Sequence, residues 1–531
     1  MLSRVKPNRL SMDQSKTLQQ PVENQLPGTP AAGESTAHGG EHHPANRGAG
    51  NSAEAIALVG TLLLAAGVRL WGLGREALWA DETASLRAAS GSLYDVLVQY
   101  HHYENTPPLY YLLLNLFGRL FGTMNDAVIR LPSVIFGTLG VLGVWWLVRA
   151  ISAGYPTVES RRDRSALVGP IVAALIAALS LQQIWFSQEA RAYSLFAMAS
   201  LMSSTLLLRA LNQPTVPRCA AYVMASIVMC YSHFAAAGVL MAHCFCGVVA
   251  VARSSRLDRW AFVATQCAIG LACLPLIPTA LKTRGRMIGF SDRTLSFAAE
   301  KFADTYLWLF DNVWVLLPVI CLAAVGVIKL RATISSKVLV AGLILLPPLP
   351  PLIGWYTGGA QYFSRHALPS GLALAVAVGM GLAALPRRAA WTTGAAVVAG
   401  VILSLIAGRE HFRKPAMREA AAFVAAHAHP GDTIICSFML TGWSFDRYFD
   451  RTDVRRRNYD EFTIAQLARS GEGIDRIWVV FFQVPSILEP YLKENPMQMT
   501  VHQSFHEILV LRFDRPLQGN APTTTPAAPA G

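Results

Sequence analysis

Residues 55–83 read AIALVGTLLLAAGVRLWGLGREALWADET and decide how the rest of the chain is interpreted. The segment 55–73 is almost entirely apolar and is close to the length of about 20 residues that a membrane span needs. Two adjacent carboxylates, Asp81 and Glu82, follow it after a linker of seven residues. Acidic groups are costly to hold near lipid, so such a pair usually marks chemistry or ion handling rather than packing. We therefore expect a membrane protein that presents this acidic pair at one membrane face.

Composition extends this interpretation to the whole chain. Of the 531 residues, 53% are hydrophobic and 15% are charged, whereas soluble domains carry about 25% charged residues. The net charge of +12 does not indicate nucleic-acid binding, because the basic residues are scattered between apolar runs. The pattern predicts a polytopic α-helical membrane protein and no nucleic-acid partner.

About eleven segments are apolar and long enough to be spans. A further apolar segment, 108–122, would be only about 22 Å long as a helix, and it contains Asn115 and Arg119. If this segment lies at the interface, the basic loops share one side of the membrane, as the positive-inside rule requires. The predicted spans are 55–73, 131–149, 166–186, 193–211, two within 219–252, 261–281, 312–330, 338–356, 367–385 and 389–408.

The same rule places the N-terminus in the cytoplasm and the first outer loop, 74–130, on the periplasmic side. That loop is expected to contain two interfacial helices, over 83–100 and 108–122. The polar, low-complexity segments 1–54, a cytoplasmic tail, and 516–531 are predicted to be disordered.

Residues 409–515 differ in pattern from the membrane part, 55–408. About 105 residues suffice for a small α/β domain, and the parity of the spans places it in the periplasm. The expected elements are a helix over 417–428 and strands over 433–438, 476–482 and 508–513.

The outer face collects the polar residues that need a functional explanation. Basic residues on this face are contrary to the positive-inside rule, and binding of an anionic ligand would explain their presence. Besides Asp81 and Glu82, the candidate site residues are Glu189, Arg191, Tyr193, His233, Arg284, Arg286, Tyr362 and Arg365.

Four motifs in order are similar to those of a known family. They are the acidic pair after the first span, ENTPPLYY at 104–111, RLPS at 130–133 and SQEARAYSL at 187–195. Together they resemble the GT-C superfamily of membrane glycosyltransferases, in particular family 39 with the protein O-mannosyltransferases and the aminoarabinose transferase-like enzymes. Many relatives carry His directly before the Pro-Pro pair, whereas this chain has Asn105-Thr106 there.

The resemblance implies transfer of a sugar from a polyprenyl-phosphate donor to a lipid, glycan or protein acceptor at the periplasmic face of the inner membrane. It also implies that Asp81, or the pair that it forms with Glu82, is the catalytic acidic group. No cofactor is required; a divalent metal ion is possible, because some relatives hold one near their acidic residues.

The residue types fit this chemistry on physical grounds. A carboxylate in a partly desolvated cleft can have its pKa raised toward the working pH and accept the proton of an acceptor hydroxyl, which is the role expected of Asp81. Glu82 is expected to orient Asp81 or to bind sugar hydroxyls. The leaving phosphate favours arginine, which offers several fixed donors. The candidates are Arg191, Arg284, Arg286 and Arg365.

Simpler roles stay open for the same residues. Asp81 and Glu82 could start a helix, and Glu189 with Arg191 could form an ordinary ion pair. The outer arginines could contact anionic lipid headgroups, the two tyrosines could be interfacial aromatics, and His233 could be a structural histidine at a helix end.

Two other functions also stay open. A lipid-linked sugar flippase would carry its charges at mid-depth in the membrane and would show internal repeats. A non-catalytic scaffold for envelope assembly would need neither feature.

Overall fold

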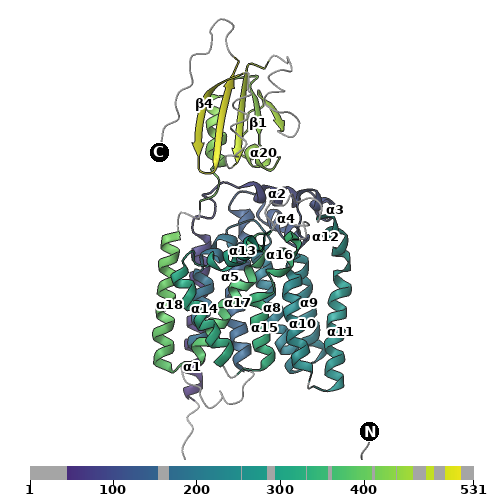
Figure 1. Ribbon diagram of the computed structural model, residues 1–531. Helices are drawn as coiled ribbons and strands as arrows, with labels where there is room; N and C mark the ends of the chain where they lie inside the picture. The colour runs from purple at the N-terminus through teal and green to yellow at the C-terminus, as the bar shows by residue number, and fades with distance from the viewer. Residues whose placement is uncertain are drawn as a thin grey trace, which may run out of the picture. The chain divides into compact units, whose positions relative to one another are not determined.

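The computed structural model describes residues 45–153, 167–252, 254–283, 294–329, 332–356, 362–408, 413–437, 439–458, 474–482 and 497–515. The chain divides into two compact units, residues 1–49 and 50–531. The second unit contains a bundle of apolar helices and a small mixed sheet with its own helices (Figure 1).

Seven helices in the described part of the chain are long and apolar enough to cross a membrane, and one bent helix pair brings the number to eight. Three shorter apolar helices run in the same bundle, and all of these lie where the sequence predicted spans. The polytopic helical fold is thereby confirmed. The long helices are α1 (Ala45–Leu70), α5 (Leu131–Ala153), α8 (Tyr193–Asn212), α11 (Arg256–Cys273) with α12 (Ile277–Thr283), α15 (Ile334–Leu345) with α16 (Leu349–Tyr356), α17 (Leu368–Ala383) and α18 (Arg387–Ala407); the shorter ones are α9 (Val216–Ser232), α10 (Ala236–Val251) and α14 (Val313–Lys329).

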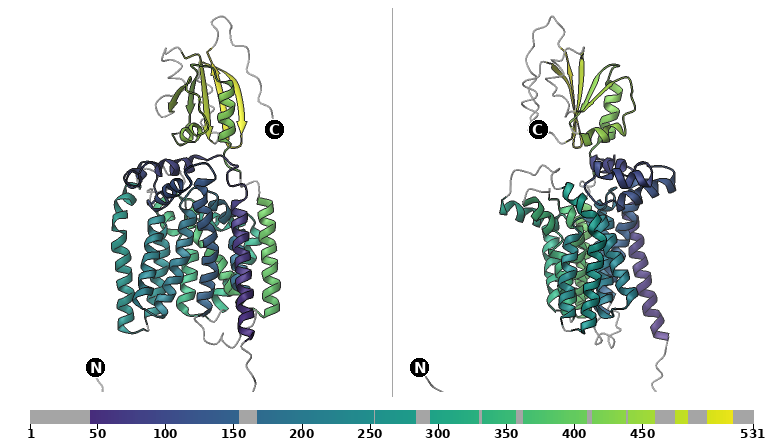
Figure 2. Two further views of the ribbon diagram at one scale, coloured as in Figure 1. Left: turned by 180° about the vertical axis from the view of Figure 1, so that it is seen from behind. Right: turned by 90° about the vertical axis from the view of Figure 1, so that its right-hand side faces the viewer.

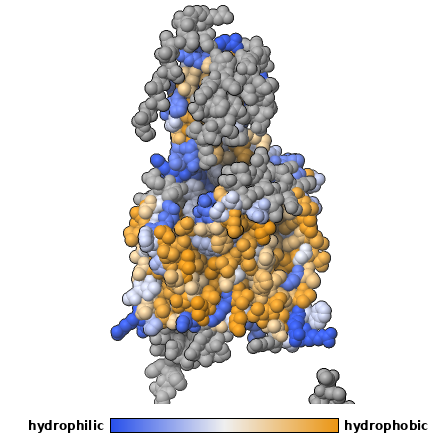
Figure 3. Space-filling view, viewed as in Figure 1, coloured by the Kyte–Doolittle hydropathy of each residue, from blue (hydrophilic) through white to orange (hydrophobic). Residues whose placement is uncertain are grey.

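Hydropathy on the surface agrees with a membrane location. On the face shown in Figure 3, hydrophobic side chains cover the sides of the helices, and hydrophilic ones gather toward the two ends of the bundle. Apolar surface of this extent is stable only against lipid or another apolar partner. The chain is a multi-pass membrane protein.

The first outer loop forms surface helices, as predicted, and none of them runs with the spans. The segment 108–122 becomes α4 (Leu109–Phe121), which lies with α2 (Ala80–Ala88) and α3 (Leu93–Tyr103) across the end of the bundle that is drawn uppermost in Figures 1 and 2. A further short helix, α13 (Leu295–Leu307), lies in a later loop at the same end.

The single helix predicted over 83–100 is wrong, because the chain forms two helices there. Gly91 adopts a φ of 90°, a conformation that glycine reaches without steric cost. Ser92 then caps α3: its hydroxyl accepts the N–H of Asp95, and the carboxylate of Asp95 accepts the N–H of Ser92 at 2.8 Å. This capping box starts a new helix and turns the chain.

The predicted span 166–186 is broken into α6 (Val168–Leu179) and α7 (Leu181–Ser187), which bend by 58°. The last carbonyls of a helix have no partner within it. Arg69, at the end of α1, is buried beside the break and donates to the carbonyls of Ala177 and Ala178 at 3.1 and 2.9 Å. Irregular backbone at membrane depth is tolerated where protein groups satisfy it in this way. The bend leads directly into the loop that carries Glu189 and Arg191.

The sheet domain contains five described strands in the order β2-β1-β3-β5-β4. Strand β1 is parallel to its neighbours β2 and β3, while β5 is antiparallel to β3 and β4. Residues of α19 and α20 pack with alternate strand residues of one sheet face. The elements are α19 (Met417–His427), β1 (Thr433–Cys436), α20 (Met439–Asp446), β2 (Arg455–Asn458), β3 (Arg476–Phe482), β4 (Gln498–Phe505) and β5 (Ile508–Asp514).

Three of these strands and α19 lie where the sequence predicted them, whereas β2 and β4 were not predicted. Most residues of β4 are exposed, so the strand lacks the buried apolar face that marks a half-buried strand. The predicted domain limits stay predictions, as do the disordered tails. α1 begins at Ala45, inside the predicted tail 1–54.

Candidate functional site

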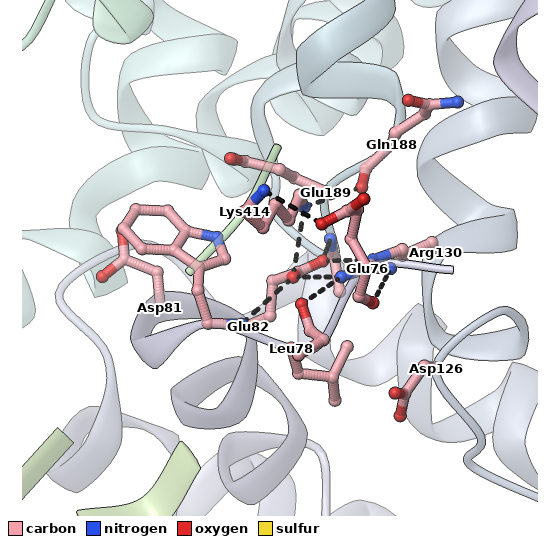
Figure 4. Close-up of polar contacts among 12 residues, drawn as sticks. Glu76, Leu78, Asp81, Glu82, Asp126, Arg130, Gln188, Glu189 and Lys414 are labelled. Atoms are coloured by element: carbon pink, nitrogen blue, oxygen red, sulfur yellow. Dashed lines mark hydrogen bonds and ion pairs between the residues drawn. The ribbon is translucent and has the colours of Figure 1, made fainter. Parts of the chain in front are cut away.

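Glu82 lies in the first turn of α2, is fully buried and has both carboxylate oxygens occupied (Figure 4). Arg130 donates from Nε to Oε1 at 2.7 Å and from Nη2 to Oε2 at 2.6 Å. The N–H of Ala190 donates to Oε1 at 3.0 Å, and Nζ of Lys414 lies 3.1 Å from Oε2. Burial alone would raise the pKa of Glu82, but Arg130 and Lys414 lower it to about 2. Glu82 is therefore an ionised anchor with no exposed atom.

Arg130 also fixes the chain that leads from α1 to α2. It lies in η1 (Val128–Arg130), and its guanidinium donates to the carbonyls of Leu73, Glu76 and Ala77 at 2.8 to 3.0 Å. One arginine thus ties the two ends of the first outer loop together and sets where α2 begins.

Asp81, the neighbour of Glu82, points away from that cluster (Figure 4). Its side chain is 21% exposed, and Nη2 of Arg365 lies 3.2 Å from Oδ2. Arg365 belongs to η5 (Ser364–Ala367). Its guanidinium lies 5.8 Å from the ring centres of both Trp79 and Tyr193. Asp81 is therefore the carboxylate of the pair that a ligand can reach, and it stands beside a cation held among aromatic rings.

Three buried hydrogen-bond donors gather around this ion pair without a protein partner in the part of the chain that the structure describes. They are Nε of Arg365, Nε1 of Trp79 and Nε2 of His233. The Nδ1 atom of His233 accepts the N–H of Ala235 at 3.1 Å, and burial together with Arg191 and Arg365 lowers the pKa of His233 to about 3. The neutral ring therefore carries its proton on Nε2 and can donate.

The rings link these donors to one another. The ring of His233 lies 5.7 Å from the ring of Tyr193 and 5.2 Å from the ring of His366. Buried donors are almost always satisfied, so unpaired ones need an explanation. An anionic ligand is the species that would satisfy these N–H groups and Arg365 together.

Arg191 is paired with Glu104 and not with Glu189, so the simple ion pair considered for Glu189 and Arg191 does not form. Arg191 also donates to the backbone carbonyl of Asp81 at 3.1 Å. Burial acts to lower the pKa of Arg191, but Glu104 raises it well above its ordinary value. Glu104 belongs to the ENTPPLYY motif, and this contact explains how that motif supports the site.

Glu189 is a buried carboxylate that is only half satisfied. Oε1 accepts the indole N–H of Trp185 at 2.8 Å, while Oε2 has no partner among the described residues. Burial raises the pKa of Glu189 to about 7, against the opposing effect of Lys414. Glu189 therefore changes its charge near neutral pH.

One cluster brings together five of the predicted residues: Asp81, Arg191, Tyr193, His233 and Arg365. They come from the first outer loop, from the loop that leads into α8, from the turn after α9 and from η5. The structure does not bring Tyr362 into this cluster: its hydroxyl bonds Thr305 at 2.5 Å, and its ring packs near Trp355. Arg284 and Arg286 lie outside the described residues.

Sequence reasoning missed four contributors, among them Arg130, which was quoted only as part of the RLPS motif. Trp79 stands two residues before Asp81, and an indole beside an acidic pair at a membrane edge was a usable signal. Glu104 was quoted within a motif without a role. Lys414 gave no signal, because it lies in a short polar stretch after the last span.

Among the described residues, no group of three or more His, Cys, Asp and Glu side chains is arranged to hold a metal ion. The expectation that no cofactor is required stays a prediction, and a divalent metal stays possible.

Comparison with known proteins gives the class of fold. No protein-family model and no curated protein matches the sequence. Solved structures do match, and the fold is GT-C-like, as predicted.

Two solved structures illustrate the likeness. ArnT from Cupriavidus metallidurans bound to undecaprenyl phosphate has a TM-score of 0.54 and 13% identity, over 86% of this chain and 97% of that chain. The Archaeoglobus fulgidus oligosaccharyltransferase in the apo form has a TM-score of 0.51 and 12% identity, over 80% of this chain and 69% of that chain. At these identities the likeness establishes the fold alone.

Proposed function

We propose that the protein is an integral membrane glycosyltransferase that uses a polyprenyl-phosphate-linked sugar as donor. The observation that carries the proposal is the set of unpaired buried donors around the Asp81–Arg365 pair. The ArnT structure, which is similar in fold, was solved with undecaprenyl phosphate bound. A prenyl phosphate is an anion that arrives from the bilayer, so it suits a cationic site at the end of the spans.

The reaction follows from the residues around Asp81. A hydroxyl oxygen of the acceptor attacks the anomeric carbon of the sugar, and its proton passes to the Asp81 carboxylate. The bond between that carbon and the phosphate oxygen breaks, and polyprenyl phosphate leaves with the electron pair. Arg365 can stabilise this anion through Nε while Nη2 stays on Asp81, since a guanidinium has five donors.

Trp79 and His233 add neutral donors to the same anion. Preorganised donors in a site sheltered from water stabilise developing charge more than they would in water. Arg191 supports this arrangement from behind, because it is held by Glu104 and holds the backbone carbonyl of Asp81.

The proposed roles divide the acidic pair. Glu82 has no free oxygen and no exposed atom, which favours a positioning role over contact with sugar. Asp81 then acts alone as the base. The sugar, whether hexose or pentose, and the acceptor stay open.

A flippase is the runner-up, and the placement of charge favours the enzyme. The ionisable residues of the cluster lie in outer loops and at helix ends. A transporter concentrates such groups at mid-depth in its helices. A scaffold offers no reason for unpaired buried donors.

The fate of a labelled donor tests the proposal. Membranes with and without the protein receive undecaprenyl phosphate carrying a labelled hexose or, separately, a labelled pentose. We expect protein-dependent release of undecaprenyl phosphate and label in an acceptor fraction. Label that crosses the membrane still joined to its lipid would establish the flippase instead, and no change with either donor would remove the proposed function.

We also propose that the site and the sheet domain face the periplasm. The positive-inside rule supports this orientation. A reporter that is active only in the periplasm, fused after residue 408, is expected to be active, and the same reporter fused after residue 386, between α17 and α18, is expected to be silent. The opposite pattern would invert the orientation.

A further inference from the structure

Lys414 belongs to the segment that starts the sheet domain, yet its side chain lies inside the acidic site. The side chain is 4% exposed. Its Nζ donates to the carbonyl of Gln188 at 2.9 Å and lies 3.1 Å from Oε2 of Glu82. Its backbone N–H donates to Oε2 of Glu76 at 3.2 Å. One residue from the C-terminal domain thus joins the first outer loop to the loop that carries Glu189.

The same domain also holds the backbone in front of Asp81. Ser444 donates its hydroxyl proton to the carbonyl of Leu78 at 2.5 Å, and the hydroxyl of Tyr448 accepts the N–H of Leu78 at 2.6 Å. Tyr448 in turn donates to Oδ2 of Asp126 at 2.6 Å. Both backbone groups of Leu78, three residues before Asp81, are therefore fixed by the sheet domain.

Further ion pairs make this contact firm. Arg418 and Arg447 both reach Asp126, at 2.7 and 3.2 Å. The guanidinium of Arg87 lies 4.8 Å from the ring centre of Trp443. These contacts leave the buried Lys414 in a defined place, so its charge acts on the site at a fixed distance.

Glu189 is the group that this charge acts on most directly. The charged groups that face it are Lys414, Glu82, Arg365 and Asp81, and its one hydrogen-bond partner among the described residues is Trp185. Glu82 is neutralised by Arg130 as well as by Lys414. Removal of Lys414 would leave Glu82 paired with Arg130 and Asp81 paired with Arg365, and Glu189 would lose the cation that lowers its pKa most.

We propose that Lys414 is a positioning residue of the transfer reaction: it joins the two outer loops that carry Asp81 and Glu189 and balances their negative charge. This inference rests on the proposed function. It assigns the sheet domain a part in the reaction, because that domain supplies Lys414, one of the cations of the site.

Two measurements on the full-length protein in detergent test the inference. The first is labelling of Glu189 by dicyclohexylcarbodiimide, which reacts with protonated buried carboxyl groups, followed by mass spectrometry across pH. Because the pKa of Glu189 is raised to about 7, wild-type labelling should be high at acidic pH and fall as pH rises through neutrality. Lys414→Met should move this midpoint to higher pH, and Lys414→Arg should restore it.

The second measurement is steady-state transfer. Lys414→Met should lower kcat by about tenfold or more with little change in KM for the donor, since Lys414 does not face the unpaired donors. Lys414→Arg should recover much of the rate. Lys337→Met, a matched change of a half-buried lysine that bonds the carbonyl of Ile328, should alter neither measurement.

Misfolding is separated from the proposed effect by a second variant. Lys414→Gln keeps an N–H donor for the carbonyl of Gln188 but has no charge, so it should fold and still move the labelling midpoint. An unmoved midpoint in folded Lys414→Gln, with unchanged kcat, would overturn the inference even if the wild type transfers sugar. A moved midpoint in a protein that transfers no sugar would sustain the charge coupling and reject the proposed function.

Discussion

Asp81→Asn should reduce sugar transfer by about 100-fold or more, because a positioned general base contributes about 10²–10⁴ to a rate. The amide keeps the shape of the side chain and can still bond Arg365, but it cannot accept the acceptor proton. Transfer of label from undecaprenyl-phosphate sugar measures the loss.

The control must show that only chemistry is lost. Asp95→Asn changes a partly exposed carboxylate of the same outer loop, where asparagine can still accept the cap hydrogen bond of α3, and it should keep wild-type rates. Binding of undecaprenyl phosphate to Asp81→Asn should be close to normal. Wild-type turnover in Asp81→Asn would remove Asp81 from the mechanism.

Glu82→Gln, in contrast to Asp81→Asn, should affect stability first. It should destabilise the protein by about 3–5 kcal/mol, since it leaves Arg130 and Lys414 buried without their counter-charge. A lower Tm in detergent, or loss of folded protein, is the expected readout. In the wild type the lowered pKa of Glu82 means that this stabilisation is complete above about pH 4.5 and is lost as pH falls toward 2.

A double-mutant cycle identifies the partner. Glu82→Gln combined with Lys414→Met should be less destabilising than the sum of the two single changes, because each removes part of the same contact. Additive effects would mean that Lys414 and Glu82 do not interact. A Glu82→Gln protein of normal Tm that has lost only activity would return Glu82 to the catalytic role first expected of it.

Much of the fold could be predicted because lipid imposes one rule on every span. Apolar length alone located the helices of the bundle, and the distribution of basic residues kept α4 out of it. The break between α2 and α3 was also readable, since Gly91 and the Ser92–Asp95 capping pattern lie in the sequence. Strand β4 was not, because an exposed strand carries no burial pattern.

The sequence predicted several residues of the site correctly, but it did not predict which of them contact one another. Asp81 and Arg365 were named by separate arguments, one from acid near lipid and one from cations on the outer face. Their contact joins residues far apart in sequence, and no local pattern encodes it. The different roles of Asp81 and Glu82 could not be predicted either, because helix geometry points adjacent residues in different directions.

The cap that Arg69 places on the broken helix has a practical consequence. A shortened protein designed to contain only the outer loops could be made to begin after the first span. Such a protein would leave the carbonyls of Ala177 and Ala178 bare in an apolar interior, and the segment bearing Glu189 would lose its support. Any minimal functional fragment must therefore begin upstream of residue 69.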